Sequence, residues 1–190
     1  MNETQVRIFF EDLMLRGLGL DMEDPNLVGT PDRVARMYCR EFFANVGKEF
    51  TNFKSFPNDK GYDQIIMADN IDFVSVCSHH FLPFTGKAWI LYIPDKKLTG
   101  LSKMARVVTH YAARPQIQET LCHDILASFV KNIQPLGAMI FMRAEHACMQ
   151  CRGAKQANAG MGTSQIWGVF KENPNIKSEG LDLIKISLAR

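Results

Sequence analysis

The chain has 190 residues and a formal net charge of +2, with 46% apolar and 22% charged residues. This length suits one domain, or one domain with an appended helical segment, and the composition is that of a globular protein. A net charge this small does not favour nucleic acid or an anionic membrane as a partner. No apolar run reaches the roughly 18 residues of a membrane span, and the start lacks the pattern of a secretory signal. We therefore expect a cytoplasmic protein.

The first part of the chain is predicted to be helical. Apolar residues along one stripe predict an amphipathic helix over residues 3–18. A second helix is predicted over residues 29–46, with Thr30 as the N-cap and Pro31 at the first helical position. Residues 47–63 contain proline and glycine and are expected to form a loop.

From about residue 64 the pattern changes to strands and helices in turn. Runs rich in β-branched and aromatic residues predict strands over residues 65–77, 86–94, 137–149 and 164–170. Helical patterns cover residues 101–114, 115–133 and 178–190. The first strand has a possible break at Asp69 and Asn70, and Pro115 is expected to open the second of these helices. Residues 153–163 are rich in glycine and alanine and are expected to form a mobile loop.

The order of these elements indicates the fold class. Two strands, two helices and two further strands follow one another, which gives the order ββααββ. Strands on either side of a helix pair are typical of an α+β domain with an antiparallel sheet. We assign residues 1–60 to an N-terminal helical segment and residues 61–190 to the main domain.

Cysteine and histidine residues gather in two places. Cys77 and His80 have Cys-x-x-His spacing at the end of a predicted strand, and His146, Cys148 and Cys151 follow much later. Thiolate and imidazole are the preferred ligands of zinc. His146 and Cys148 are two apart, so in an extended strand they would face the same side. The odd number of cysteines, spread unevenly, does not predict a disulfide framework.

Two ligand sets remain open at this point. The closed set consists of Cys77, His80, Cys148 and Cys151, and it would make a structural zinc site. Without Cys151, the three remaining ligands would leave a position for water, as in a catalytic site. His79 and His146 would then lie beside the metal, where imidazoles are useful for proton transfer. The alternative for His79 is an ordinary surface residue.

A second cluster lies at the start of the helix predicted over residues 101–114. Ser102 stands near the helix N-terminus, and Lys103 and Arg106 are three apart, hence on one face. Free backbone N–H groups, a hydroxyl and two cations together form an anion site. Arg152 could add a third cation from the cysteine-rich segment. The alternative is a solvated basic helix start.

The next helix begins with polar residues that have two interpretations. Gln118 and Glu119 lie in its first turn. A glutamate there usually complements the helix dipole. If it faces a cavity instead, its two oxygens can accept hydrogen bonds from adjacent N–H groups, as on the edge of a guanine. The pattern alone does not choose between these.

Together, these segments resemble the GTP cyclohydrolase I family. The resemblance runs from about Thr30 to Phe170, and several separate motifs occur in the same order. They read "TPDRVARM", "CSHHFLPFTGKAWILYIP", "GLSKMARVV", "ARPQIQE", "EHACMQCRG" and "GTSQIWGVF". The resemblance implies the tunnelling fold, an antiparallel four-stranded sheet with a helix pair, assembled into a ring-shaped homodecamer with active sites at subunit boundaries.

The resemblance also implies roles for individual residues. Cys77, His80 and Cys148 match residues that hold a zinc ion (Zn²⁺), which favours the open site because Cys151 matches no metal ligand. His79 and His146 match residues that handle protons. The triphosphate is held by residues that match Ser102, Lys103, Arg106 and Arg152. Gln118 and Glu119 match residues that contact the ribose and the guanine.

The implied substrate is GTP. The implied reaction opens the guanine imidazole ring at C8 with zinc-activated water, releases formate and rearranges the ribose to give 7,8-dihydroneopterin triphosphate. One departure is Ser78, which stands where the family usually has glutamate. This motivates an alternative, an enzyme of the same fold that acts on another purine nucleotide or stops at an earlier product. A further alternative is a non-catalytic assembly protein with a closed structural zinc.

Overall fold

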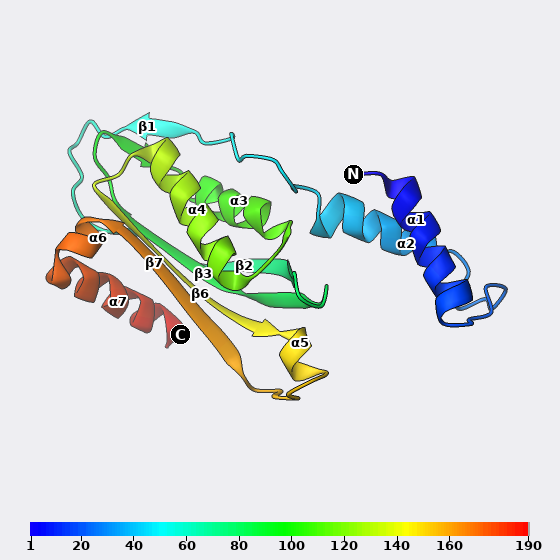
Figure 1. The fold of residues 1–190 in the computed structure, drawn as a ribbon. Helices are drawn as coiled ribbons and strands as arrows, with labels where there is room; N and C mark the ends of the chain where they lie inside the picture. Colours follow the sequence, from blue (N-terminus) through cyan, green and yellow to red (C-terminus); the bar gives the residue numbers. More distant parts are fainter. Residues whose placement is uncertain (190) are drawn as a thin grey trace.

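A five-stranded sheet forms the centre of the molecule (Figure 1). The structure is a computed structural model that describes residues 1–189, and its sheet has the strand order β5-β2-β3-β6-β7. The strands are β2 (Ile66–Cys77), β3 (Pro83–Ile93), β5 (Pro115–Gln116), β6 (Gly137–His146) and β7 (Gly160–Gly168). The short β5 pairs in parallel with the end of β2, and the other neighbours are antiparallel. The predicted α+β class is confirmed.

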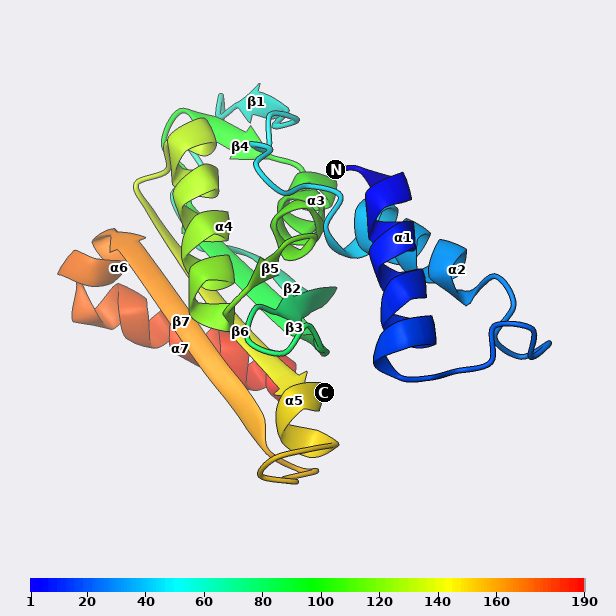
Figure 2. The ribbon, with the colours of Figure 1, turned by 45° about the vertical axis from the view of Figure 1, so that its right-hand side comes forward.

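Helices cover both faces of this sheet (Figure 2). They are α3 (Leu101–Ala112) and α4 (Gln118–Ile133) on one face, and α6 (Val169–Glu172) and α7 (Pro174–Leu188) on the other. The larger core lies under α3 and α4 and includes the buried ring of Phe129. A smaller core around Trp89 and Phe170 lies under α7. Because both faces are covered, β3 is buried continuously from Ala88 to Ile93 rather than at alternate residues.

A partly buried hydrogen-bond network joins α7 to the sheet. Trp89 Nε1 donates to Ser187 Oγ over 3.0 Å, and that hydroxyl donates to Asp69 Oδ2 over 2.8 Å. The side-chain amide of Asn70 donates to the same hydroxyl over 3.1 Å. Asp69 and Asn70 form a bulge in β2, with Asn70 at a φ of 52°. The predicted break is therefore a bulge, and the strand continues beyond it.

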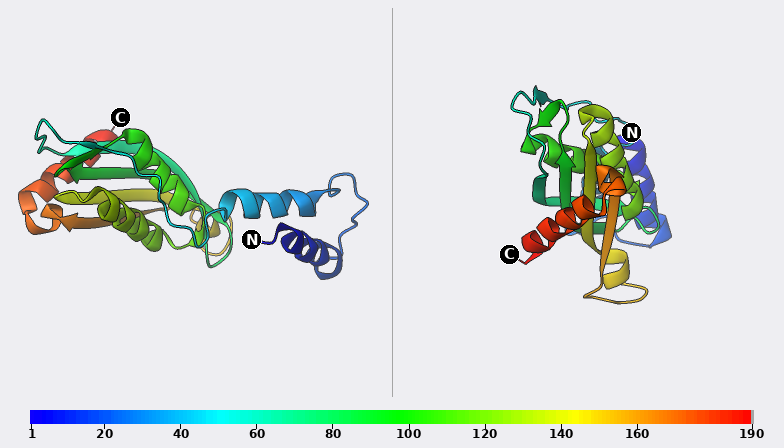
Figure 3. Two further views of the ribbon diagram at one scale, coloured as in Figure 1. Left: turned by 90° about the horizontal axis from the view of Figure 1, so that it is seen from above. Right: turned by 90° about the vertical axis from the view of Figure 1, so that its left-hand side faces the viewer.

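The N-terminal helices project from one end of the sheet (Figure 3). They are α1 (Glu3–Asp12) and α2 (Thr30–Arg36), each followed by a wider π-helical turn, Leu13–Gly17 and Met37–Phe42. The ring of Phe43 packs edge-on against Phe81, 5.5 Å between centroids, and so joins this segment to the turn after β2. Within residues 1–189, no helix combines the length and apolarity that a membrane crossing needs.

Three local predictions are corrected by the structure. Gly29, with a φ of 74°, occupies the N-cap position predicted for Thr30. Pro115 lies in β5, and the helix begins only at Gln118, because Ile117 is still extended. The segment predicted as a loop contains β1 (Ser55–Pro57), which pairs with β4 (Lys97–Thr99) in a separate small sheet.

Candidate metal centre and active site

A tight turn between β2 and β3 holds the first two candidate ligands. The backbone N–H of Phe81 donates to Cys77 O, and the N–H of Cys77 donates to Leu82 O, each over 2.9 Å. Phe81 has a φ of 54°, a conformation that costs energy for a residue with a side chain. This backbone turns sharply within five residues and brings Cys77 and His80 to the same side.

The third candidate ligand comes from a different kind of element than predicted. β6 ends at His146, and Cys148 lies on the one-turn helix α5 (Ala147–Gln150). The prediction that His146 and Cys148 share the face of a strand is therefore wrong. The ligand atoms of Cys77, His80 and Cys148 nevertheless lie within 4.8 Å of one another.

Cys151 lies outside this group of three. Its side chain is exposed, and its Sγ donates to Ala147 O over 2.9 Å. The closed four-ligand arrangement that the sequence left open therefore has no support in the geometry.

The three side chains fit a tetrahedral zinc ion. With Zn–S bonds near 2.3 Å, two thiolates in a tetrahedral site lie about 3.8 Å apart, within the spread seen here. Burial, followed by the neighbouring Cys77 thiol, raises the pKa of Cys148. A divalent cation would reverse this effect because it favours the thiolate form. Arg152 donates to His80 Nε2 over 2.7 Å and so occupies the one lone pair of the neutral ring, which means that zinc would replace this hydrogen bond when it binds His80.

A cavity of about 440 Å³ adjoins the three candidate ligands. Predicted site residues that line it are Cys77, His79, His80, Gln118, Glu119, His146 and Cys148. They come from the end of β2, the start of α4, the end of β6 and α5. Arg152 reaches the same place through its hydrogen bond to His80. The structure thus brings metal ligands, imidazoles and a carboxylate to one cavity.

His146 is held firmly within this cavity. Its Nε2 lies 2.9 Å from Gln118 Oε1, and its ring is parallel to that of Phe84 with centroids 4.6 Å apart. Burial lowers the pKa of His146, and the negative charge of Glu119 partly offsets this effect. His79 is more exposed, with its Nδ1 3.8 Å from Cys77 Sγ. The two histidines therefore differ in environment, and burial favours the neutral imidazole at His146.

The predicted anion residues lie elsewhere in the chain. The first half of α3 carries Ser102, Lys103 and Arg106. The other end of α3 leads into β5, and β5 pairs with the end of β2 at Cys77. A helix of this length is about 18 Å long, so Ser102 and Lys103 lie about one helix length from the end that leads to β5, and Arg106 lies about half that length from it. Within one chain, the structure does not bring them to the cavity.

Asn52 and Lys54 lie near the start of α3, and the sequence analysis did not identify either of them as a candidate site residue. Lys103 is buried, and its Nζ donates to Asn52 Oδ1 over 2.9 Å. Burial, and then the positive charges of Arg106 and Lys54, lower the pKa of Lys103. Asn52 and Lys54 lie in the segment predicted as a loop, and no periodic signal marks them. Three cations that repel one another at a helix N-terminus are suited to bind an anion.

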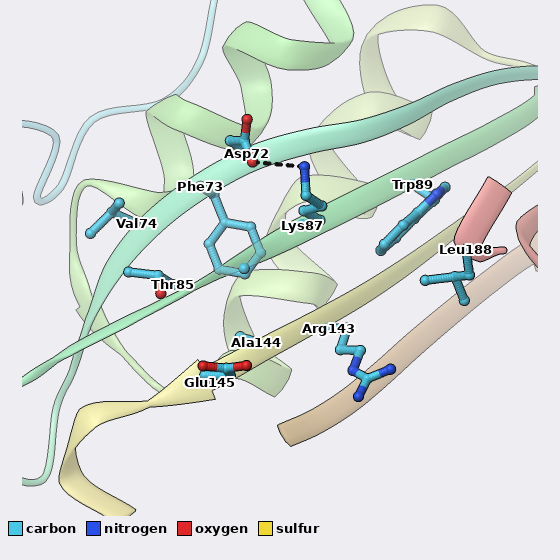
Figure 4. Close-up of a pocket in the computed structure, with 11 residues that line it drawn as sticks. Asp72, Phe73, Val74, Thr85, Lys87, Trp89, Arg143, Ala144, Glu145 and Leu188 are labelled. Carbon is cyan, nitrogen blue, oxygen red and sulfur yellow. Dashed lines mark ion pairs between the residues drawn. The ribbon is translucent and has the colours of Figure 1, made fainter. Parts of the chain in front are cut away.

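A larger cavity, of about 510 Å³, lies on the other face of the sheet near the end of α7 (Figure 4). Lys87 and Asp72 form an ion pair there over 3.1 Å, and Arg143, Glu145 and Leu188 line the same space. Charges of both signs are present, but the candidate metal ligands lie at the smaller cavity. The chemistry of the side chains, rather than cavity size, therefore identifies the candidate active site.

Comparisons with known proteins identify the family. The sequence profile described as "GTP cyclohydrolase I" matches residues 10–185. A protein of Aquifex aeolicus named "GTP cyclohydrolase 1" is 41% identical over 175 residues, covering 91% of this chain and 92% of that protein. A protein of the same name from Pelotomaculum thermopropionicum is 39% identical, covering 91% of this chain and 92% of that protein. Another from Acetivibrio thermocellus is 38% identical, covering 97% of this chain and 98% of that protein. The chain therefore belongs to the GTP cyclohydrolase I family.

Proposed function

We propose that this protein is a zinc-dependent GTP cyclohydrolase I. It opens the imidazole ring of the guanine of GTP at C8, releases formate and yields 7,8-dihydroneopterin triphosphate. The single observation that carries the proposal is the meeting of Cys77, His80 and Cys148 at a cavity that two further histidines also line. Family membership adds the substrate and the reaction class.

The residues of the cavity have separate tasks in this proposal. Cys77, His80 and Cys148 would hold zinc, which when bound would lower the pKa of water to near 7 and so provide the nucleophile for hydrolysis. Glu119 accepts hydrogen bonds from the N–H groups of guanine, because its carboxylate lines the cavity from the start of α4. His146 and His79 move protons to and from the reacting purine and ribose.

The triphosphate requires cationic side chains, and within one chain Lys103 and Arg106 do not line the cavity. Arg152 is already beside His80, whereas Ser102, Lys103 and Arg106 lie on the first half of α3 and do not line the cavity. We propose that a neighbouring copy brings its own α3 start to this cavity. The site then lies at a subunit boundary, as expected for a homodecamer of tunnelling-fold subunits.

The remaining proposals concern the setting of the enzyme. Residues 1–60 are assigned to a helical segment and residues 61–190 to the catalytic domain. The enzyme is expected in the cytoplasm, with GTP as its substrate and with neither nucleic acid nor a membrane as a partner. The small net charge supports the expectation that neither nucleic acid nor an anionic membrane is a partner.

The decisive experiment is turnover of GTP by the purified full chain loaded with zinc. We expect one equivalent of formate and a pterin that fluoresces after oxidation. The Cys148→Ala variant is the matched control, because it removes a ligand from the half-buried α5 position and should lose both zinc and product. A fully zinc-loaded wild type that releases no formate would contradict the proposal.

Ser78 supports a second candidate function. It is exposed on the turn between Cys77 and His79, where the family usually has a carboxylate. A neutral hydroxyl at this position changes the charge beside the metal centre and could alter which purine nucleotide is preferred, or end the reaction at an earlier product. A panel of purine nucleoside triphosphates, with product masses determined, separates the two candidates. Faster turnover of a nucleotide other than GTP would favour the second.

A further inference from the structure

Gln118 lines the active-site cavity, yet its side chain is almost fully buried. Only 1% of its surface is exposed. Its amide nitrogen lies 3.1 Å from Met161 O and 3.3 Å from Met142 O, and 3.0 Å from Thr163 Oγ1. Backbone carbonyl oxygens only accept hydrogen bonds, so the NH₂ group must face β6 and β7. The amide oxygen, Oε1, is therefore the atom that faces His146.

This orientation determines which nitrogen of His146 carries a proton. Gln118 Oε1 lies 2.9 Å from His146 Nε2 and can only accept. Nε2 must therefore be the donor, which leaves the lone pair of the neutral ring on Nδ1. Phe84 is fully buried and stacks parallel to the imidazole with centroids 4.6 Å apart, so it opposes rotation of the imidazole out of this plane.

We infer that Gln118 is a positioning residue that acts through His146, and that His146 Nδ1 is the nitrogen that exchanges protons with the substrate. This inference deepens the proposed function and rests on it for the identity of the substrate. It differs from the role implied by the family resemblance, a direct contact to the ribose or guanine. The amide of Gln118 is already bonded to the strands and to His146, and its burial leaves little surface for a ligand.

The test combines a spectroscopic and a kinetic measurement on the full-length, zinc-loaded protein. Nitrogen-15 NMR of labelled histidine reports which ring nitrogen is protonated, and the His146→Asn variant assigns the His146 signals. Gln118→Met keeps the side-chain length but removes both hydrogen-bonding ends. Gln116→Met is the matched control, because Gln116 is also buried and bonds to Ser75 and to the Tyr111 carbonyl instead of His146.

We expect the wild type to carry the His146 proton on Nε2, and Gln118→Met to show a mixture of the two tautomers. Its kcat should fall on the order of ten- to a hundredfold, the range of a misplaced acid–base group, with KM for GTP little changed. Gln116→Met should leave both the His146 tautomer and kcat as in the wild type, even if it lowers stability.

Two results would overturn the inference. One is a nitrogen-15 spectrum of the wild type that places the His146 proton on Nδ1. This spectrum can be measured even if Gln118→Met fails to fold. The other is a Gln118→Met variant with raised KM and unchanged kcat, which would make Gln118 a substrate contact. A wild type that does not turn over GTP contradicts the proposed function, whereas the tautomer measurement still decides whether Gln118 orients His146.

Discussion

Gly86 lies in β3, directly beside the backbone of β6, and it offers a sharp test of how the sheet supports the candidate active site. A Cβ atom at Gly86 would lie 2.0 Å from Arg143 O and 2.7 Å from the Cα of Ala144. Both obstacles are backbone atoms, so no side-chain rotation relieves them. Gly86 pairs with Ala144, and two residues along the same strands Phe84 pairs with His146. Gly86→Ala must therefore separate the strands beside the stacked rings.

The expected cost follows from these distances. Overpacking typically costs about 1–3 kcal/mol, and each ladder hydrogen bond that lengthens costs about 1 kcal/mol, so we expect a loss of about 2–4 kcal/mol. In a chain of this size each kcal/mol lowers Tm by about 2–4 °C, which gives a decrease of roughly 5–15 °C. Activity should fall as well, because the position of His146 depends on the same strand pair.

The control for this prediction is Gly162→Ala on the neighbouring strand. A Cβ at Gly162 would meet only the Phe141 ring, at 3.4 Å, which is an ordinary contact. Gly162 pairs with Arg143, so both substitutions test the same region of the sheet. Calorimetry at matched protein concentration and GTP turnover should show Gly162→Ala close to the wild type. Equal Tm values for the two variants would refute the close-approach argument.

Three further predictions follow from the described contacts. Cys151→Ala should leave the zinc content, measured by atomic absorption, as in the wild type; loss of the ion would make this cysteine a fourth ligand. Asn52→Ala frees the Lys103 ammonium, so KM for GTP should rise severalfold with kcat little changed, and an unchanged KM would remove Lys103 from phosphate binding. Ser187→Ala leaves the buried Trp89 N–H unpaired, which should cost about 1–3 kcal/mol in urea unfolding; a loss below about 0.5 kcal/mol would show that the network contributes little.

The sequence, read together with the family resemblance, was sufficient to predict which three side chains meet at the candidate metal centre, but not how they meet. The ligand atoms of Cys77, His80 and Cys148 do lie together. The argument that His146 and Cys148 share a strand face was wrong, because the strand ends at His146. The one-turn helix that follows is too short to leave a periodic signal, and only its place in the fold determines where Cys148 lies.

Other features depended on tertiary contacts that no local pattern encodes. Asn52 reaches Lys103 across 51 positions of sequence, from a segment with no helical or strand period. The hydrogen bonds of Gln118 to β6 and β7 likewise come from distant elements. By contrast, runs of β-branched and aromatic residues were enough to predict the main strands, and apolar residues at helical spacing were enough to predict the main helices, because burial in the core favours these patterns directly.

The turn at residues 77–80 and the short helix that holds Cys148 are far apart in the sequence but place their candidate ligand atoms within 4.8 Å of one another. An ion bound by both segments would cross-link the chain across a loop of about 70 residues. Closing a loop of that size reduces the conformational entropy of the unfolded chain, which stabilises the folded state by about 4 kcal/mol. The metal would thus stabilise the fold of the domain as well as take part in the reaction. A chelator should then lower the melting temperature even of a variant that keeps the three metal ligands but no longer turns over GTP.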